Sequence, residues 1–157
     1  MHLGVLNGAQ DKFDASLIYH YKALNIRFLK LGQNDPAVAT SYGNIGNILY
    51  RKNDFDGAIE VHMKAIKIRE QVFGVQSKEI IETYNNLGKA YKEKKEYANS
   101  LIYFDRALKA KIYQVGQLSK ELAKYYTSLS EVYYLKGDTK NGDFYKGKAE
   151  FSSKQKS

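Results

Sequence analysis

The chain repeats itself with a period of 42 residues. Tyrosine recurs at Tyr42, Tyr84 and Tyr126, each separated from the next by that spacing. Further sets of residues share it: Leu3/Ile45/Leu87/Leu129, Gly4/Gly46/Gly88, Phe13/Phe55/Tyr97, Ala23/Ala65/Ala107/Ala149 and Gly32/Gly74/Gly116. A fixed period of this length indicates a protein built from stacked copies of one structural unit.

Each period contains two amphipathic helical patterns. In the first, apolar residues follow one another at steps of four, three and four, which places them on one face of a helix. These residues are Val38/Tyr42/Ile45/Leu49, Ile80/Tyr84/Leu87/Tyr91 and Leu122/Tyr126/Leu129/Tyr133. The second pattern begins at Phe55 and again at Tyr97. We therefore predict an all-α fold, an α-solenoid of antiparallel helix pairs with one concave and one convex side.

The unit boundaries follow from helix start and stop signals. Asp35-Pro36, Ser77 and Ser119 are suited to cap a first helix, and Gly32, Gly74 and Gly116 lie where a second helix should end. We predict a single domain, 1–157, composed of a partial repeat 1 (1–34), repeat 2 (35–76), repeat 3 (77–118) and repeat 4 with a C-terminal cap (119–157). Repeat 1 is partial because Leu3 and Gly4 correspond to the middle of a first helix.

Small residues are expected where two helices of a pair approach closely. Gly46 and Gly88 should face Ala65 and Ala107, because a larger side chain there would overpack the contact. Repeat 4 departs from the pattern, with Gly142, Asp143, Lys146 and Glu150 where repeat 3 has Ser100, Leu101, Phe104 and Leu108. Its last helix is therefore expected to face water as a terminal cap.

Composition narrows the function classes. The formal charge is +8, but of the 25 basic residues 21 are lysine and only four arginine, whereas arginine is the usual residue for reading phosphates and bases. Nucleic-acid binding is therefore not favoured. The chain has no cysteine, which excludes a disulfide framework, a thiol nucleophile and a cysteine-ligated zinc, and it fits a cytoplasmic protein. No apolar run is long enough for a membrane span.

The repeated motif resembles the tetratricopeptide repeat. The motif reads Tyr-x-Asn-Ile/Leu-Gly at 42–46 and 84–88, with an aromatic residue at Phe55 or Tyr97 and then Ala65 or Ala107. The common repeat has about 34 residues, and the longer 42-residue form is similar to the repeats of kinesin light chains. The resemblance implies a right-handed superhelix, a non-enzymatic scaffold or adaptor, a protein or peptide partner, and no cofactor.

In this family, ligands usually lie along the concave side, which the first helices line. The resemblance therefore implies a peptide-binding set on those helices: Asn44, Asn47, Tyr50, Arg51, Asn85, Asn86, Lys89, Lys92 and Tyr134. An asparagine amide both donates and accepts hydrogen bonds, so it suits an extended peptide backbone, and the cations favour an acidic one. The alternative is that Asn44 and Asn86 only join neighbouring helices and that the lysines are ordinary surface.

The same residues allow two alternatives to this peptide groove. One family subtype clamps a terminal carboxylate. Asn47 and Lys89 match two of its positions, but Glu131 and Val5 depart from it, so that mode is not favoured. The other is a structural role, in which the chain packs on neighbouring repeats or forms a homo-oligomer through the truncated repeat 1. That reading predicts that polar changes at Leu3 and Leu6 alter assembly.

The sequence offers no catalytic or metal-binding set. His20 and His62 are one period apart, and Phe104 is the next residue of that series, so the position is interpreted as an aromatic packing site rather than a metal ligand. Asp54 and Asp56 lie in a predicted turn, where capping explains them better than acid–base catalysis. We expect no enzyme activity and no metal.

Overall fold

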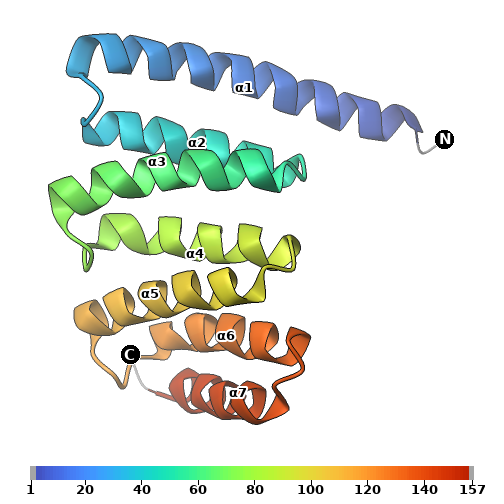
Figure 1. Cartoon of the computed structure of the whole chain (residues 1–157), viewed down its shortest axis with the longest axis vertical. Coiled ribbons are helices and arrows are strands. Elements are labelled where there is room, and N and C mark those ends of the chain that lie inside the picture. The colour runs from blue at the N-terminus through green and yellow to red at the C-terminus, as the bar shows by residue number, and fades with distance from the viewer. Residues whose placement is uncertain (1–2, 156–157) are drawn as a thin grey trace. The chain divides into compact units, whose positions relative to one another are not determined.

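The computed structural model describes residues 3–155, with side chains from Lys12 onward. The chain is all-helical over these residues (Figure 1). The helices are α1 (Leu3–Leu31), α2 (Pro36–Arg51), α3 (Phe55–Phe73), α4 (Lys78–Glu93), α5 (Tyr97–Val115), the short 3₁₀ helix η1 (Lys120–Leu122), α6 (Ala123–Leu135) and α7 (Thr139–Ser153). They form two compact units, Met1–Val72 and Phe73–Ser157.

The first unit packs α2 and α3 as a pair, with α1 against them. Ile45 and Leu49 of α2 form a buried cluster with Ala58 and Val61 of α3, and Leu17 of α1 packs on its edge. Arg27 Nη1 of α1 also donates a hydrogen bond to Ser41 Oγ of α2, at 2.7 Å. The apolar stripes identified in the sequence therefore form the core.

The second unit contains two antiparallel pairs, α4 with α5 and α6 with α7, and in each pair a tyrosine near the end of the first helix stacks on a tyrosine of the second. Tyr91 of α4 stacks on Tyr103 of α5, with ring centroids 5.6 Å apart. One period later Tyr133 of α6 stacks on Tyr145 of α7, at 5.4 Å. Parallel, offset rings at this distance stabilise a pair beyond the area that they bury.

The helix ends follow the period in their backbone conformation. Asn53, Lys95 and Gly137 have φ of 62°, 61° and 82° in the turns inside the pairs, and Gly32, Gly74 and Gly116 have φ of 85°, 81° and 76° after the second helices. The predicted glycine stops are confirmed. Lysine at position 95 shows that the period sets this left-handed turn even where the residue does not favour it.

The predicted first-helix caps are only partly right. Asp35 Oδ1 accepts a hydrogen bond from the Ala37 amide at 2.7 Å, and Ser119 Oγ accepts one from the Glu121 amide at 3.2 Å. Ser77 precedes α4, but its side chain makes no capping bond, and its Oγ is buried without a hydrogen-bond partner. The prediction of a capping hydroxyl at Ser77 is therefore wrong.

The close approach at Gly46 and Gly88 is confirmed, but its expected partners are wrong. A Cβ on Gly46 would lie 2.6 Å from His62 Nε2, and one on Gly88 would lie 2.7 Å from the Phe104 ring. Ala65 is instead buried against Val38, Ala39 and Ile68. The partner of each glycine is a flat ring rather than a second small residue.

Repeat 1 and repeat 4 both differ from the middle repeats. Positions 3–31, which include half of a first helix and a second helix by the period, form the single helix α1. In α7 only Gly142 and Ser152 are buried, and Glu150 is exposed where the equivalent Leu108 of α5 is 5% exposed. At this position α7 carries a polar residue where α5 carries an apolar one, while Phe144 and Phe151 of α7 are exposed apolar residues.

Candidate functional site

A groove in the second unit runs along α4 and is closed by the end of α5 and the start of α6. Its volume is about 480 Å³. Its lining residues come from all three helices: Lys78, Ile81, Glu82, Asn85, Asn86, Lys89, Lys111, Gln114, Lys124 and Tyr125. Three of the nine predicted binding residues, Asn85, Asn86 and Lys89, are therefore brought together here.

The groove is positively charged. Lysines from all three helices line it, against one carboxylate, that of Glu82. Lys111 is partly neutralised by Glu121, at 2.5 Å, and this hydrogen bond holds the pKa of the Glu121 carboxyl below its ordinary value. No carboxylate in residues 12–155 forms an ion pair with Lys78, Lys89 or Lys124. The Lys124 ammonium lies 4.9 Å from the centroid of the Tyr125 ring.

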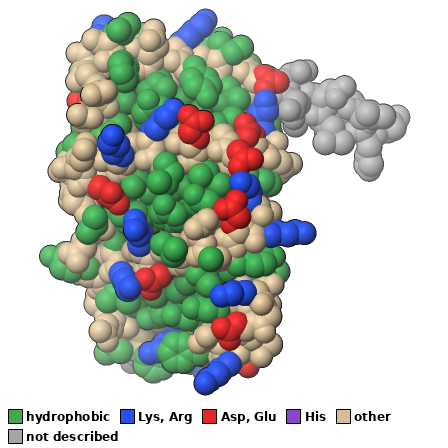
Figure 2. All heavy atoms as spheres, viewed as in Figure 1, with side chains coloured by type: hydrophobic (Ala, Val, Ile, Leu, Met, Phe, Trp, Pro, Cys, Tyr) green, Lys and Arg blue, Asp and Glu red, His purple; other side chains and the backbone are tan. Residues whose placement is uncertain are grey.

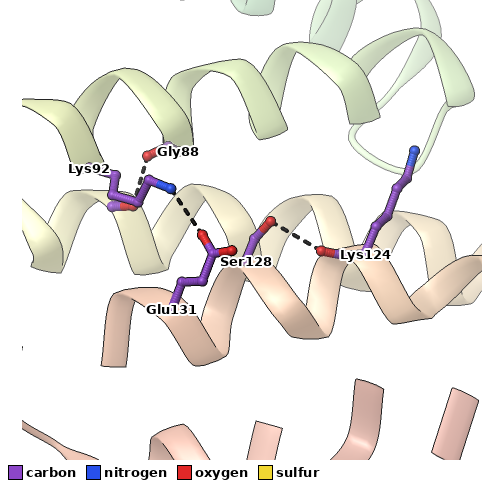
Figure 3. A network of polar contacts seen from close by, with 6 residues as sticks. Gly88, Lys92, Lys124, Ser128 and Glu131 are labelled. Carbon is purple, nitrogen blue, oxygen red and sulfur yellow. Dashed lines mark hydrogen bonds and ion pairs between the residues drawn. The ribbon is translucent and has the colours of Figure 1, made fainter. Parts of the chain in front are cut away.

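Lys92, also predicted to bind peptide, does not line the groove. Its ammonium forms an ion pair with Glu131 of α6 at 3.0 Å, which ties neighbouring first helices together (Figure 3). Figure 3 also shows Lys124 extending away from this pair, toward the other end of the two helices. The ammonium of Lys92 is therefore paired within the chain by Glu131. Lys124, in contrast, is one of the residues that line the groove.

The remaining predicted residues are spread over other places. Tyr134 lies between α6 and α7, where its hydroxyl donates to Asp143 Oδ1 at 2.5 Å and its ring covers Gly142. The hydrogen bond to Asp143, and then burial, raises the pKa of Tyr134. Tyr50 makes an edge contact with Phe55 in the first unit.

Arg51, Asn44 and Asn47 also belong to the first unit. The Arg51 guanidinium lies 4.9 Å from the centroid of the Phe13 ring of α1. Asn44 and Asn47 are exposed on α2. The structure therefore gathers the repeat 3 part of the predicted set into one groove and leaves the other predicted residues outside it.

Three lysines of the groove, Lys78, Lys111 and Lys124, are not in the peptide-binding set predicted from the sequence. Lys111 is one period after Arg69 and two after Arg27, so the 42-residue spacing contained a signal for it. Arg27 reaches Ser41 at the start of the following first helix, and Lys111 likewise reaches Glu121. Lys78 recurs as Lys120 one period later, although its counterpart in repeat 2 is Pro36.

His62 is a packing residue. It is 1% exposed, neither ring nitrogen has a hydrogen-bond partner among the described residues, and its ring lies on Gly46. Burial, and then the nearby Arg69 cation, lowers the pKa of His62 to about 4. No cluster of three or more histidine, aspartate or glutamate residues suited to a metal ion occurs in the described part of the chain.

The surface charges are mixed. On the face of each unit seen in Figure 2, lysine and arginine side chains alternate with acidic ones and with hydrophobic areas. The charge on this face is therefore not gathered into the continuous basic stripe that binds a nucleic-acid backbone. Within the described residues, no helix combines the length and the apolarity needed to cross a bilayer.

The family model for the tetratricopeptide repeat matches residues 1–71 and 37–112, and the chain belongs to this family. Proteins of this class are helical-repeat interaction or scaffold modules. The all-α solenoid class predicted from the period is thereby confirmed, together with the resemblance to kinesin-light-chain-type repeats.

Solved structures with the same fold support this assignment. BtubC (BKLC) from P. vanneervenii has a TM-score of 0.81 at 23% identity, over 89% of this chain and 56% of that one, so this chain spans little more than half of that protein. A putative kinesin light chain from Podosopora anserina with nearly identical TPR-like repeats has a TM-score of 0.79 at 10% identity, over 90% and 67%. MamA has a TM-score of 0.56 at 17% identity, over 95% and 93%. No curated protein matches the sequence.

Proposed function

We propose that the chain is a non-enzymatic adaptor module that binds an extended acidic segment of a partner protein in the groove of α4, α5 and α6. The observation that carries this proposal is the convergence of lysines from three helices around two adjacent asparagines. Lysine ammonium groups attract carboxylates, and the asparagine amides can pair with the peptide backbone.

The position of the polar groups supports an extended ligand. Asn85 and Lys89 are four residues apart on α4, so they lie on one face of that helix, one turn from each other. Lys124 adds a charge from α6 on the opposite side of the same groove. A segment lying along α4 would therefore meet amide groups and cations in succession.

The test uses a defined probe. A fluorescein-labelled peptide with a run of glutamates in a Gly/Ser background is titrated with the full chain, and a companion peptide carries glutamines instead. We expect the acidic peptide to bind and the double variant Asn85→Ala/Lys89→Ala to weaken binding at least about tenfold, because hydrogen bonds to charged groups are lost. The melting curve should not change, since Lys89 is exposed and Asn85 is half-buried.

The matched control is Lys109→Ala. Lys109 is an exposed lysine of α5 that lies outside the groove and pairs with Asp105. It should leave peptide affinity unchanged. Equal affinity of the wild type and the double variant, or equal affinity for the glutamate and glutamine peptides, would contradict the proposed groove.

A further inference from the structure

Lys111 differs from the other lysines of the groove in its burial. Its side chain is 16% exposed, whereas Lys78, Lys89 and Lys124 are exposed residues. An ammonium group that is largely withdrawn from water needs an anion beside it, because burying a charge without a partner is costly. In the chain by itself that anion is Glu121, whose Oε2 lies 2.5 Å from Lys111 Nζ.

The Glu121 carboxylate is held close to two cations of the groove. The hydrogen bond from Lys111 is the main cause that lowers the pKa of Glu121, and the positive charge of Lys124 lowers it further. Both lysines line the groove. The Glu121 side chain itself is 54% exposed, so it can turn toward water without any burial of its charge. A carboxylate of the chain thus occupies a position that suits a carboxylate of an acidic ligand.

An acidic residue at this position is not needed to build such a helix junction. Two periods before Lys111 and Glu121, the sequence has Arg27 and Ala37. Alanine offers no carboxylate there, and Arg27 Nη1 donates instead to Ser41 Oγ, at 2.7 Å. The helix α2 nevertheless forms, with its first turn capped. The equivalent junction in the first unit therefore forms without an anion at the position of Glu121.

We propose that Glu121 is an internal competitor of the ligand, and that a carboxylate of the bound partner segment takes its place on Lys111. This inference rests on the proposed function, because it names the cation that anchors the acidic partner. The exchange replaces one charge-assisted hydrogen bond by another, so Lys111 keeps an anion in both states. Glu121 is then a specificity-determining residue, since a segment without a carboxylate has nothing to exchange for it.

The first test is Glu121→Gln, titrated with the glutamate peptide. Glutamine has nearly the same shape and still accepts a hydrogen bond from Lys111, but it carries no charge that competes with the ligand. We expect the affinity for the glutamate peptide to rise by about fivefold, which corresponds to one exposed ion pair. The affinity for the glutamine peptide should not change.

A double-mutant cycle distinguishes exchange at Lys111 from a general effect of charge. Lys111→Gln alone should weaken binding of the glutamate peptide, because the anchor is lost. In that background, the further change Glu121→Gln should alter the affinity by less than about twofold, the range within which independent sites are additive. An equal gain in both backgrounds would show that Glu121 acts through long-range repulsion, and it would overturn the exchange.

The matched control is Asp105→Asn. Asp105 of α5 also pairs with a lysine, since its Oδ2 lies 2.7 Å from Lys109 Nζ, but neither residue lines the groove. The substitution changes the net charge by the same amount as Glu121→Gln, and it should leave the peptide affinity unchanged. Circular dichroism melting of each variant shows whether the helical fold is retained.

The outcomes separate this inference from the proposed function. If neither the wild type nor Glu121→Gln binds the glutamate peptide, the proposed function fails and the exchange fails with it. If the wild type binds and Glu121→Gln binds no more tightly, only the exchange is overturned. The Lys111–Glu121 pair is then a fixed part of the helix junction.

Discussion

At the scale of single residues, the contact between the helices of a pair depends on a glycine beside a ring, and repeats 3 and 4 supply it from opposite helices. In repeat 3 Gly88 is on the first helix and Phe104 on the second. In repeat 4 Gly142 is on the second helix and Tyr134 on the first. A serine beside the glycine changes helices as well. In repeat 3 Ser100 Oγ of α5 donates to the Gly88 carbonyl at 2.7 Å, and in repeat 4 Ser130 Oγ of α6 donates to the Gly142 carbonyl at 2.8 Å. The contact is conserved in shape although its residues exchange helices.

The ring position in repeat 2 makes stability depend on pH. Because the pKa of His62 is about 4 in the folded chain and about 6.5 when unfolded, the unfolded state binds the extra proton between these values. The contribution of neutral His62 to the free energy of unfolding is complete above pH 6.5. It is lost as the pH falls toward 4, by up to about 3 kcal/mol. We expect His62→Phe to remove this loss, since phenylalanine occupies the equivalent position at Phe104.

Urea unfolding of both proteins across that pH window measures the effect. The difference in unfolding free energy between His62→Phe and wild type should grow as the pH falls. Phe104→His is the reciprocal control, and it should introduce a second loss of the same sign in the same window. A constant difference between His62→Phe and wild type at all pH values would be inconsistent with a neutral, buried imidazole.

At the scale of helices, the period determines where each helix ends, but the chemistry of the ends differs. The left-handed residues recur in register, whether they are asparagine, lysine or glycine. The side-chain cap bonds do not recur in every repeat. Asp35 and Ser119 accept hydrogen bonds from backbone amides, whereas Ser77 does not. Ser77 has the extended backbone of an N-cap residue, with φ −72° and ψ 152°, and still makes no side-chain cap bond, so the residue type at the cap position does not determine the bond.

Two substitutions distinguish these caps. Asp35→Ala should lower the unfolding free energy by about 1 kcal/mol, because the Ala37 amide loses its acceptor. Ser77→Ala should have almost no effect, or stabilise slightly, because the Ser77 hydroxyl is buried without a partner. Thermal or urea unfolding at neutral pH measures both. Equal losses for the two variants would show that Ser77 caps α4 in solution.

At the scale of the whole chain, the excess of positive charge should act on binding more than on folding. The formal charge of +8 raises the local concentration of anions around the molecule, and salt screens that attraction. The groove lysines place part of this charge where the proposed ligand lies.

We therefore expect the affinity of the chain for a charged peptide, but not for a neutral one, to depend on salt concentration. Affinity for the glutamate peptide should fall as sodium chloride is raised, whereas any residual affinity for the glutamine peptide should not. Lys89→Ala/Lys124→Ala should flatten the dependence, and Lys109→Ala should preserve most of it, because Lys109 pairs with Asp105 outside the groove. Fluorescence polarisation over a salt series measures all four. A steep dependence that the groove variant does not reduce would assign the attraction to the rest of the surface.

The candidate site was only partly predictable. Asn85, Asn86 and Lys89 could be found from the face of one helix, because residues three and four apart share a face whatever lies opposite. Lys92 and Tyr134 were predicted from helix faces in the same way. Lys92 is instead bound by Glu131 of a neighbouring helix, and Tyr134 by Asp143. Lys111 and Lys124 join the groove from two other helices. Which side chains meet across helices is a property of packing and not of helical spacing.

From the sequence alone, the helical class, the pairing and the turn positions were determined, because apolar periodicity and a fixed repeat length are local properties that stacking can satisfy in only one general way. Only the tertiary structure decided that the rings of His62 and Phe104 fill the space beside the glycines, that α1 continues through the place of a turn, and that lysines of three helices share one groove. These outcomes depend on distances between segments that are far apart in sequence, which no local pattern encodes.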